Sequence, residues 1–233
     1  MWKGNLIACG TNAKTVKGDG SEILTAIMYL KPFKTGGHNL CANAEIAGCV
    51  DGCLVSAGRG QMDSVQRGRE RKTWWFINDR DGFMRQLIKD IESFVRYCGK
   101  RDILPAVRLN GTSDIRWETI KVDGQSLMER FPMVQFYDYT KIANRRVPDN
   151  YHLTFSYSAA REIYLKQVAK ALDRGMNIAV VFRHKATMPK QFLGRDVING
   201  DRDDLRFLDP SNVIVGLYAK GKAVKDTSGF VVG

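Results

Sequence analysis

The stretch "YHLTFSYSAAREIYLKQVAKALDRGMNIAVVFRH" (residues 151–184) decides the fold class of this sequence. It begins with the short aromatic and β-branched run "YHLTFSY" (151–157), continues with apolar residues at helical spacing, and ends in the apolar run "IAVVFRH" (178–184). Short apolar runs with little alternation predict strands that are buried on both faces, and the segment between them predicts a helix. A strand, a helix and a second strand in succession form the unit from which parallel sheets are built.

The same alternation extends over most of the chain. Four further runs of strand length stand at 23–30, 103–110, 133–139 and 212–218. Helices are predicted over 81–100 and 158–175, the second with Ser158 as its cap. The apolar positions of these helices are Phe83, Met84, Leu87, Ile88, Ile91, Val95 and Cys98 in the first, and Ile163, Leu165, Val168 and Leu172 in the second. Six strands are few for a complete eight-fold barrel. We therefore expect one α/β domain over residues 1–233 that forms a small or distorted TIM-like (β/α) barrel, with an open α/β sheet as the alternative.

Composition indicates a folded protein with an anionic partner. The 233 residues are 44% hydrophobic and 26% charged, and the formal net charge is +11. Basic proteins gain free energy by neutralising phosphates and releasing counterions, so nucleic acid is the leading expected partner, DNA rather than RNA. No run of eighteen apolar residues and no secretion signal is present, so we expect a cytoplasmic protein without a membrane partner. The oligomeric state stays open.

Three of the five cysteines lie in a glycine-rich segment at residues 36–60. Cys41, Cys49 and Cys53 have the spacing C-x7-C-x3-C, and His38 precedes them. Three thiolates can hold a [4Fe–4S] cluster with one iron left open, and three thiolates with an imidazole make a closed zinc site. The segment is therefore predicted to be a metal or cluster loop. Packing of the thiols as small hydrophobic groups is the structural alternative.

Two carboxylates lie at the ends of predicted strands, Asp114 in the turn after one and Asp138 at the end of the next, where α/β proteins place their chemistry. Asp114 lies in the turn "NGTSD" (110–114) and Asp138 lies among aromatic residues in "FYDYTK" (136–141). Two carboxylates in one pocket can act as nucleophile and as acid or base. The alternative is that Asp114 is a turn or helix-cap residue. The same alternative applies to Asp138 with less weight. Asn110 and Ser113 of the same turn are candidate substrate-binding residues.

Basic residues are concentrated in "GRGQMDSVQRGRERKTWWF" (58–76) and "KIANRRV" (141–147). Cations can position a protein on phosphates, while aromatic faces can hold an unstacked base. An amphipathic helix with a solvated charged face is the alternative, and for Trp74 and Trp75 we expect a place in the core. The closing segment "GLYAKGKAVKDTSGFVVG" (216–233) is a weak phosphate-binding pattern. The candidate nucleic-acid-binding cations are Arg59, Arg67, Arg69, Arg71, Lys72, Lys141, Arg145, Arg146 and Arg183.

A family of uncharacterised bacteriophage proteins is resembled over most of the chain, in the segments "NLCANAEIAGC" (39–49), "AVRLNGTSDI" (106–115), "FYDYTK", "YHLTFS" (151–156) and "GLYAKGKA" (216–223). This resemblance implies a protein made in the cytoplasm of an infected bacterial host. Two better understood families are more distantly similar. The early three-cysteine segment resembles that of radical S-adenosylmethionine enzymes, which implies an iron–sulfur cluster and S-adenosylmethionine as cosubstrate. "FYDYTKIANRR" (136–146) resembles the nucleophile strand of tRNA-guanine transglycosylases and of the phage enzymes that insert 7-deazaguanines into DNA.

Three functions follow from these observations. The leading hypothesis is a phage enzyme that exchanges guanine in DNA, in which Asp138 attacks the sugar, Asp114 hydrogen-bonds the base and shuttles its proton, and the cysteines with His38 bind structural zinc. The second is an iron–sulfur enzyme that uses S-adenosylmethionine. The third is a non-enzymatic protein that binds nucleic acid or a host protein, in which the cysteines are structural and the carboxylates are caps.

Overall fold

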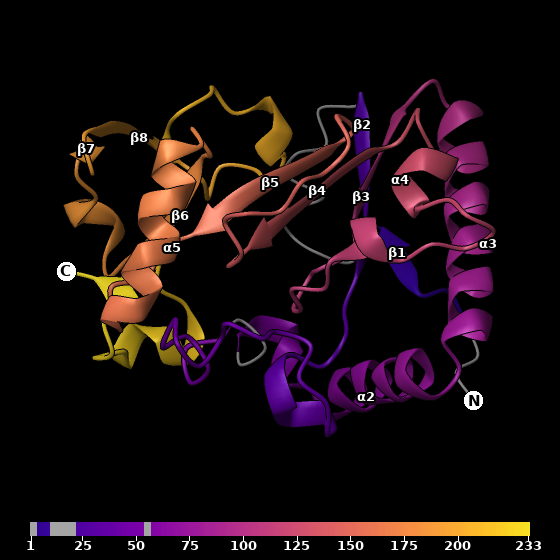
Figure 1. Ribbon diagram of the computed structural model, residues 1–233, viewed down its shortest axis with the longest axis horizontal. Coiled ribbons are helices and arrows are strands. Elements are labelled where there is room, and N and C mark those ends of the chain that lie inside the picture. The colour runs from indigo at the N-terminus through magenta and orange to yellow at the C-terminus, as the bar shows by residue number, and fades with distance from the viewer. Residues whose placement is uncertain (1–3, 10–21, 54–56) are drawn as a thin grey trace.

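The computed structural model describes residues 4–9, 22–53 and 57–233, and one sheet runs through this part of the chain (Figure 1). The strand order is β1-β2-β3-β4-β5-β6-β9-β8-β7, and β10 pairs with β6 off this path. The strands are β1 (Ile7–Cys9), β2 (Ile23–Met28), β3 (Leu104–Arg108), β4 (Gln135–Thr140), β5 (Tyr151–Ser156), β6 (Ile178–Phe182), β7 (Gln191–Phe192), β8 (Arg195–Asn199), β9 (Ile214–Tyr218) and β10 (Val231–Val232). The α-helices are α2 (Asp63–Asn78), α3 (Arg80–Gly99), α4 (Leu127–Arg130) and α5 (Glu162–Asp173).

The sheet is open, so the expected barrel is wrong and the open-sheet alternative is confirmed. Neighbours from β2 through β6 to β9 and β8 all pair in parallel. The two ends of the sheet are short antiparallel strands, β1 beside β2 and β7 beside β8. Closure requires hydrogen bonds between the first and last strands, and β1 and β7 do not pair with each other.

All six predicted strands are present, within two residues at almost every end. The strands β1, β7, β8 and β10 were not predicted, and they have only two to five residues each. Segments of two or three residues are too short to be recognised as apolar runs, and β8 has three polar residues among its five. Sequence reasoning therefore identified most of the parallel sheet and missed β8 and the short strands β1, β7 and β10.

Helix α3 confirms the predicted apolar face, and α5 corrects it. In α3 the side chains of the predicted positions are buried, apart from the partly buried Val95. In α5 the buried residues are Tyr164, Val168 and Ala171, whereas Ile163 and Leu165 are 59% and 40% exposed. Tyr164 lies on the buried face of α5, because its ring stacks on Phe155 and its hydroxyl donates a hydrogen bond to the Ser156 carbonyl oxygen at 2.6 Å.

The start of α5 also differs from the prediction. The helix begins at Glu162 after Arg161, which makes no side-chain cap. Ser158 instead accepts a hydrogen bond from the Ala160 amide at 3.1 Å, in the loop before the helix. Ser158 is thus a loop-forming residue and not the helix cap.

The core has two principal clusters of buried side chains. One lies between α3 and the strands β1 to β5 and includes Trp75 and Trp117, while the other lies between α5 and the strands β5, β6 and β9 and includes Cys41 and Cys49. None of the described helices is long and apolar enough to cross a membrane. Helix α2, the segment that precedes it and the C-terminal segment lie along one edge of the sheet, at the bottom of Figure 1.

Candidate functional site

The segment from His38 to Cys53, here called the cysteine loop, lies across the carboxyl ends of neighbouring parallel strands. Its Leu40 carbonyl accepts a hydrogen bond from the Asp114 amide, after β3, at 2.8 Å. The side chain of Asn43 donates to the Lys141 carbonyl, just after β4, at 2.8 Å. At Gly48 the backbone has a φ of +62°, and a Cβ there would lie 2.5 Å from the Ala160 Cβ after β5. The loop is therefore fixed at the edge where α/β proteins carry their active sites.

Two of the three thiols in this loop are buried. Cys41 and Cys49 are each 6% exposed and belong to the core cluster beside α5, while Cys53 is half-buried. Burial raises the pKa of the Cys41 thiol to about 11, with Lys141 acting against this shift and Asp114, Cys49 and Cys53 adding to it. The pKa of Cys49 is raised for the same reason. The three thiols therefore lie close enough for the charge of one to raise the pKa of another.

The predicted metal ligands are only partly brought together. His38 is exposed. Among the residues that the structure describes, no three His, Cys, Asp or Glu side chains are arranged to hold a metal ion. Cys9 and Cys98 lie elsewhere, on β1 and α3, and all five cysteines are free thiols. Metal binding by the cysteine loop therefore stays a prediction, supported by the chemistry of three soft donors and not by a ready ligand geometry.

Lys141 places a positive charge beside the thiols. Burial lowers the pKa of its ammonium group, but the negative charges of Cys41, Cys49 and Asp114 outweigh this effect and raise the pKa well above 10.5. A cation in this position favours the thiolate form of its neighbours. Sequence reasoning assigned Lys141 to nucleic acid, whereas in the structure it belongs to the surroundings of the cysteine loop.

Asp114 is held by the elements that follow β3 and β4. It is 6% exposed and accepts hydrogen bonds from the Thr140 hydroxyl and the Lys141 amide, both at 2.8 Å. Its Oδ1 also lies 3.3 Å from Nη1 of Arg145. Arg145 in turn makes a bidentate pair with Glu118, at 3.0 and 2.6 Å. Asp114 and Arg145 are thus parts of a buried polar network.

Asp138 belongs to the same network. It is 1% exposed and accepts hydrogen bonds from the Asn110 amide at 2.8 Å and from the Tyr151 hydroxyl at 2.9 Å. Because Arg145 Nη2 also donates to the Tyr151 oxygen at 3.2 Å, a continuous chain of contacts joins Asp138 to Asp114. Burial raises the pKa of Asp138 to about 7, although Arg108 and the hydrogen bonds to the carboxylate act against the shift.

The structure links the two carboxylates through Arg145 and Tyr151, but Asp138 lies inside β4 and not at the strand end that the sequence suggested. The strand-end rule did not predict Glu118, Tyr151 or Arg108, which complete the network and give no local sign of this role. Arg108 lies 2.7 Å from Asp204 and 3.8 Å from Asp138. The turn residues Asn110 and Ser113 are buried as well, and the Ser113 hydroxyl donates to the Asn110 side-chain oxygen at 2.8 Å.

The predicted nucleic-acid-binding cations differ in how far their side chains are exposed to solvent. Arg59, Arg67, Arg71 and Arg146 are exposed, whereas Arg69, Lys72 and Arg145 are buried. Arg183 is half-buried, and its guanidinium donates to the carbonyl oxygens of Val224, Asp226 and Gly233, so it fixes the C-terminal segment. Trp75 lies in the core as expected, but Trp74 is 62% exposed, because it lies on the solvent-facing side of α2.

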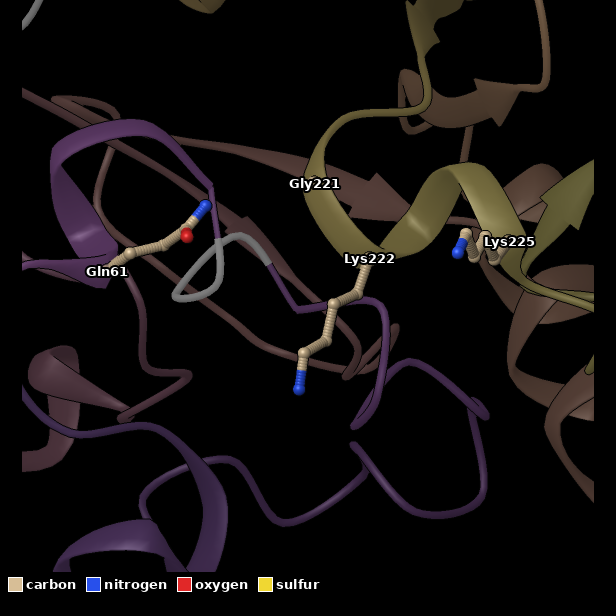
Figure 2. A pocket seen from close by; sticks show the side chains of 4 residues that line it. All are labelled: Gln61, Gly221, Lys222 and Lys225. Carbon is tan, nitrogen blue, oxygen red and sulfur yellow. The ribbon is translucent and has the colours of Figure 1, made fainter.

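A pocket of about 310 Å³ lies between the short helix η3 (Gly58–Gln61) and the short helix η7 (Gly221–Lys225). Figure 2 shows its lining: Gln61 on one side, and Gly221, Lys222 and Lys225 on the other. The cysteine loop borders this region, since a Cβ at Gly52 would lie 3.4 Å from that of Ala223. The lysines are those of the closing segment that resembled a phosphate-binding pattern.

Comparison with known proteins gives one relationship. No curated protein and no solved structure matches the chain. A protein-family model described as gene product 88 matches residues 6–233, which include every strand of the sheet, the cysteine loop and the buried network. The chain is therefore a member of the gene product 88 family.

Proposed function

We propose that this protein is an iron–sulfur enzyme whose cysteine loop holds a [4Fe–4S] cluster at the carboxyl edge of the parallel sheet. The observation that carries the proposal is the placement of three thiols from one loop, in the connection between β2 and α2, beside the Lys141 ammonium. Three thiolates leave one iron of such a cluster open for a further ligand. His38, the fourth ligand that a closed zinc site would need, is exposed.

Residues Cys41, Cys49 and Cys53 would hold the cluster, and Lys141 would offset part of its negative charge. Ligand thiols must lose their protons, and the raised pKa of Cys41 shows how strongly burial opposes this in the absence of a metal. When bound, an open-site cluster can supply one electron to a cosubstrate such as S-adenosylmethionine. In this proposal the exposed arginines of η3 and α2 would guide a nucleic-acid substrate to this edge.

The guanine-exchange alternative has less support from the geometry. It requires an Asp138 oxygen to reach a sugar carbon, yet this side chain is buried and both of its oxygens accept hydrogen bonds from protein groups. Asp138 and Asp114 are better suited to holding the ends of β3 and β4 in register beneath the cysteine loop. Positioning of the loop is therefore the role that we assign to the buried network.

The test is metal analysis of protein purified without oxygen, with single Cys→Ser variants at 41, 49 and 53 and with Cys98→Ser as a matched control. The proposal expects about four irons and a similar amount of acid-labile sulfide per chain. Each loop variant should lose the iron, while Cys98→Ser keeps it. Reduction in the presence of S-adenosylmethionine should then release methionine from the wild type and from Cys98→Ser, and from none of the three loop variants. Stoichiometric zinc without iron, or iron that survives all three loop variants, would contradict the proposal.

A further inference from the structure

The solvent-facing side of α2 presents an indole ring next to two arginines. Trp74 is 62% exposed, although tryptophan side chains are on average highly buried. Arg67 and Arg71 are also exposed, and they precede Trp74 by seven and three residues. At 3.6 residues per turn these spacings place the three side chains on one face of the helix, opposite the buried Phe76. The Trp74 ring is therefore directed to solvent, where a ligand can reach it.

Both arginines are accessible to a ligand as well. In the part of the chain that the structure describes, neither Arg67 nor Arg71 forms an ion pair or a side-chain hydrogen bond. The exposed acids Asp63 and Glu70 lie on the same helix and offset the charge of its solvent-facing side, but they are not paired with these arginines. A guanidinium with free donors can bind two phosphate oxygens at once.

An excess of positive charge comes from the segments beside the N-terminal end of α2. Arg59 of η3 is exposed, and Lys222 and Lys225 of η7 line the pocket opposite Gln61 (Figure 2). Neither lysine forms an ion pair with a described residue. These segments and α2 lie along one edge of the sheet (Figure 1). The exposed charges of residues 58–78 and 221–225 are therefore five cations, Arg59, Arg67, Arg71, Lys222 and Lys225, against the two acids Asp63 and Glu70.

We propose that this edge binds a single strand of nucleic acid, with one base stacked on Trp74 and the phosphates on the cations that extend from α2 to the pocket. The α2 surface is the name used here for Arg59, Arg67, Arg71, Trp74, Lys222 and Lys225. Cations that are free of acidic partners attract the phosphates. An exposed ring selects a single strand, because the bases of a duplex are already stacked on one another.

The α2 surface also leads toward the proposed cluster. Helix α2 rises about 17 Å from Asp63 to Trp74, which gives room for several nucleotides of one strand. At the other end of the surface, Ala223 of η7 lies against Gly52 of the cysteine loop. The inference rests on the proposed function in one respect, since it names single-stranded nucleic acid as the substrate class of that enzyme. Binding itself does not require the cluster.

The experiment measures binding of a labelled oligothymidylate of about twelve bases to the purified full chain, with a duplex of equal length and inorganic polyphosphate as comparison probes. The single strand should bind saturably and at least about fivefold more tightly than the duplex. Trp74→Ala should weaken binding of the single strand at least about fivefold and leave binding of polyphosphate unchanged, because polyphosphate has no base. Trp74→Phe keeps an aromatic ring and should restore most of the affinity.

Tyr97→Ala is the matched control for Trp74→Ala. Tyr97 is 44% exposed and lies near the C-terminal end of α3, about 25 Å along that helix from its start beside α2. Its removal should change the affinity less than about twofold. Arg67→Gln should make the affinity less dependent on salt between about 50 mM and about 200 mM, by about 0.7 in the logarithmic slope. Arg96→Gln, which removes an exposed cation of α3, should leave this slope as it is.

Four results would overturn the proposal: no saturable binding of the single strand, a duplex bound as tightly, equal affinity of Trp74→Ala and wild type, or an equal loss in Tyr97→Ala. A loss of polyphosphate binding in Trp74→Ala would also contradict stacking. Because Trp74 is exposed, its variants should fold and keep the iron content of the wild type. Iron analysis of the same samples therefore tests the cluster separately from the titration that tests the α2 surface.

Discussion

Arg145 and Glu118 form a buried bidentate ion pair, with Nη2 2.6 Å from Oε2 and Nε 3.0 Å from Oε1. Their side chains are 0% and 4% exposed. Removal of one partner from such a pair leaves an uncompensated buried charge. Because Arg145 also contacts Asp114, it joins the turn after β3 to the loop after β4.

Arg145→Met is therefore expected to lower the free energy of unfolding by about 3–5 kcal/mol, because Glu118 and Asp114 lose their common cation. Arg146→Met is the matched control, since the neighbouring side chain is exposed, and it should change stability by no more than about 0.5 kcal/mol. Urea unfolding followed by circular dichroism measures both. Similar midpoints for the two variants would mean that the network contributes little to stability.

The raised pKa of Asp138 predicts a pH dependence of stability. Burial raises this pKa to about 7, so between the ordinary aspartate pKa of 3.8 and about 7 the folded protein holds a proton that the unfolded chain has lost. Stability from this group is fully present below the unfolded pKa and is lost as the pH rises through that window, by about 4 kcal/mol in total. Asp138→Asn should remove this dependence.

The measurement compares the free energy of unfolding of the wild type and of Asp138→Asn at about pH 5 and about pH 7. The wild type should lose stability between these values relative to the variant. Parallel pH profiles would show that Asp138 keeps an ordinary pKa, which its hydrogen bonds with Asn110 and Tyr151 would then explain.

Thiol reactivity should separate the five cysteines. In metal-free protein a disulfide reagent should modify the exposed Cys9 first and the half-buried Cys53 more slowly. Burial raises the pKa of Cys41 and Cys98 to about 11, so these thiols should react only when the protein opens or unfolds. Cys9→Ser should remove the fastest phase. A fast phase that persists in this variant and disappears in Cys98→Ser would contradict the assigned burial.

Sequence reasoning predicted the elements that carry a clear hydrophobic pattern. Six parallel strands follow from apolar runs of strand length, and the apolar face of α3 follows from apolar residues at helical spacing. The edge strands are too short for this, and so the open sheet could not be distinguished from a barrel. In α5 the apolar residues Ile163 and Leu165 suggested the wrong face, because Tyr164 was not counted among the buried positions.

The candidate site shows the same division. Strand-end position suggested that Asp114 and Asp138 could be brought together, because that rule depends only on topology. Burial of cations was missed because the helix considered over the basic run 58–76 was expected to have a solvated charged face. At helical spacing Arg69, Lys72 and Phe76 share one face, and the buried phenylalanine marks that face as the inner one. Glu118 and Tyr151 join the network through tertiary contacts alone.

Gly111 provides a test of the close approach between the turn after β3 and the end of β2. Its amide donates a hydrogen bond to the Met28 carbonyl at 3.0 Å, and a Cβ at this position would lie 2.6 Å from that oxygen and from the Tyr29 ring. Gly111→Ala must displace either the backbone or the ring, so it should cost about 1–3 kcal/mol of stability.

Gly99→Ala is the control for this substitution, because Gly99 ends α3 with nothing within 4 Å of a Cβ. Alanine there should stabilise the helix by about 0.5–1 kcal/mol, since it restricts the unfolded chain. Urea unfolding measures both variants. Equal stability of Gly111→Ala and Gly99→Ala would show that the turn after β3 can move away from the end of β2 without cost, which the contacts of Gly111 with Met28 and Tyr29 contradict.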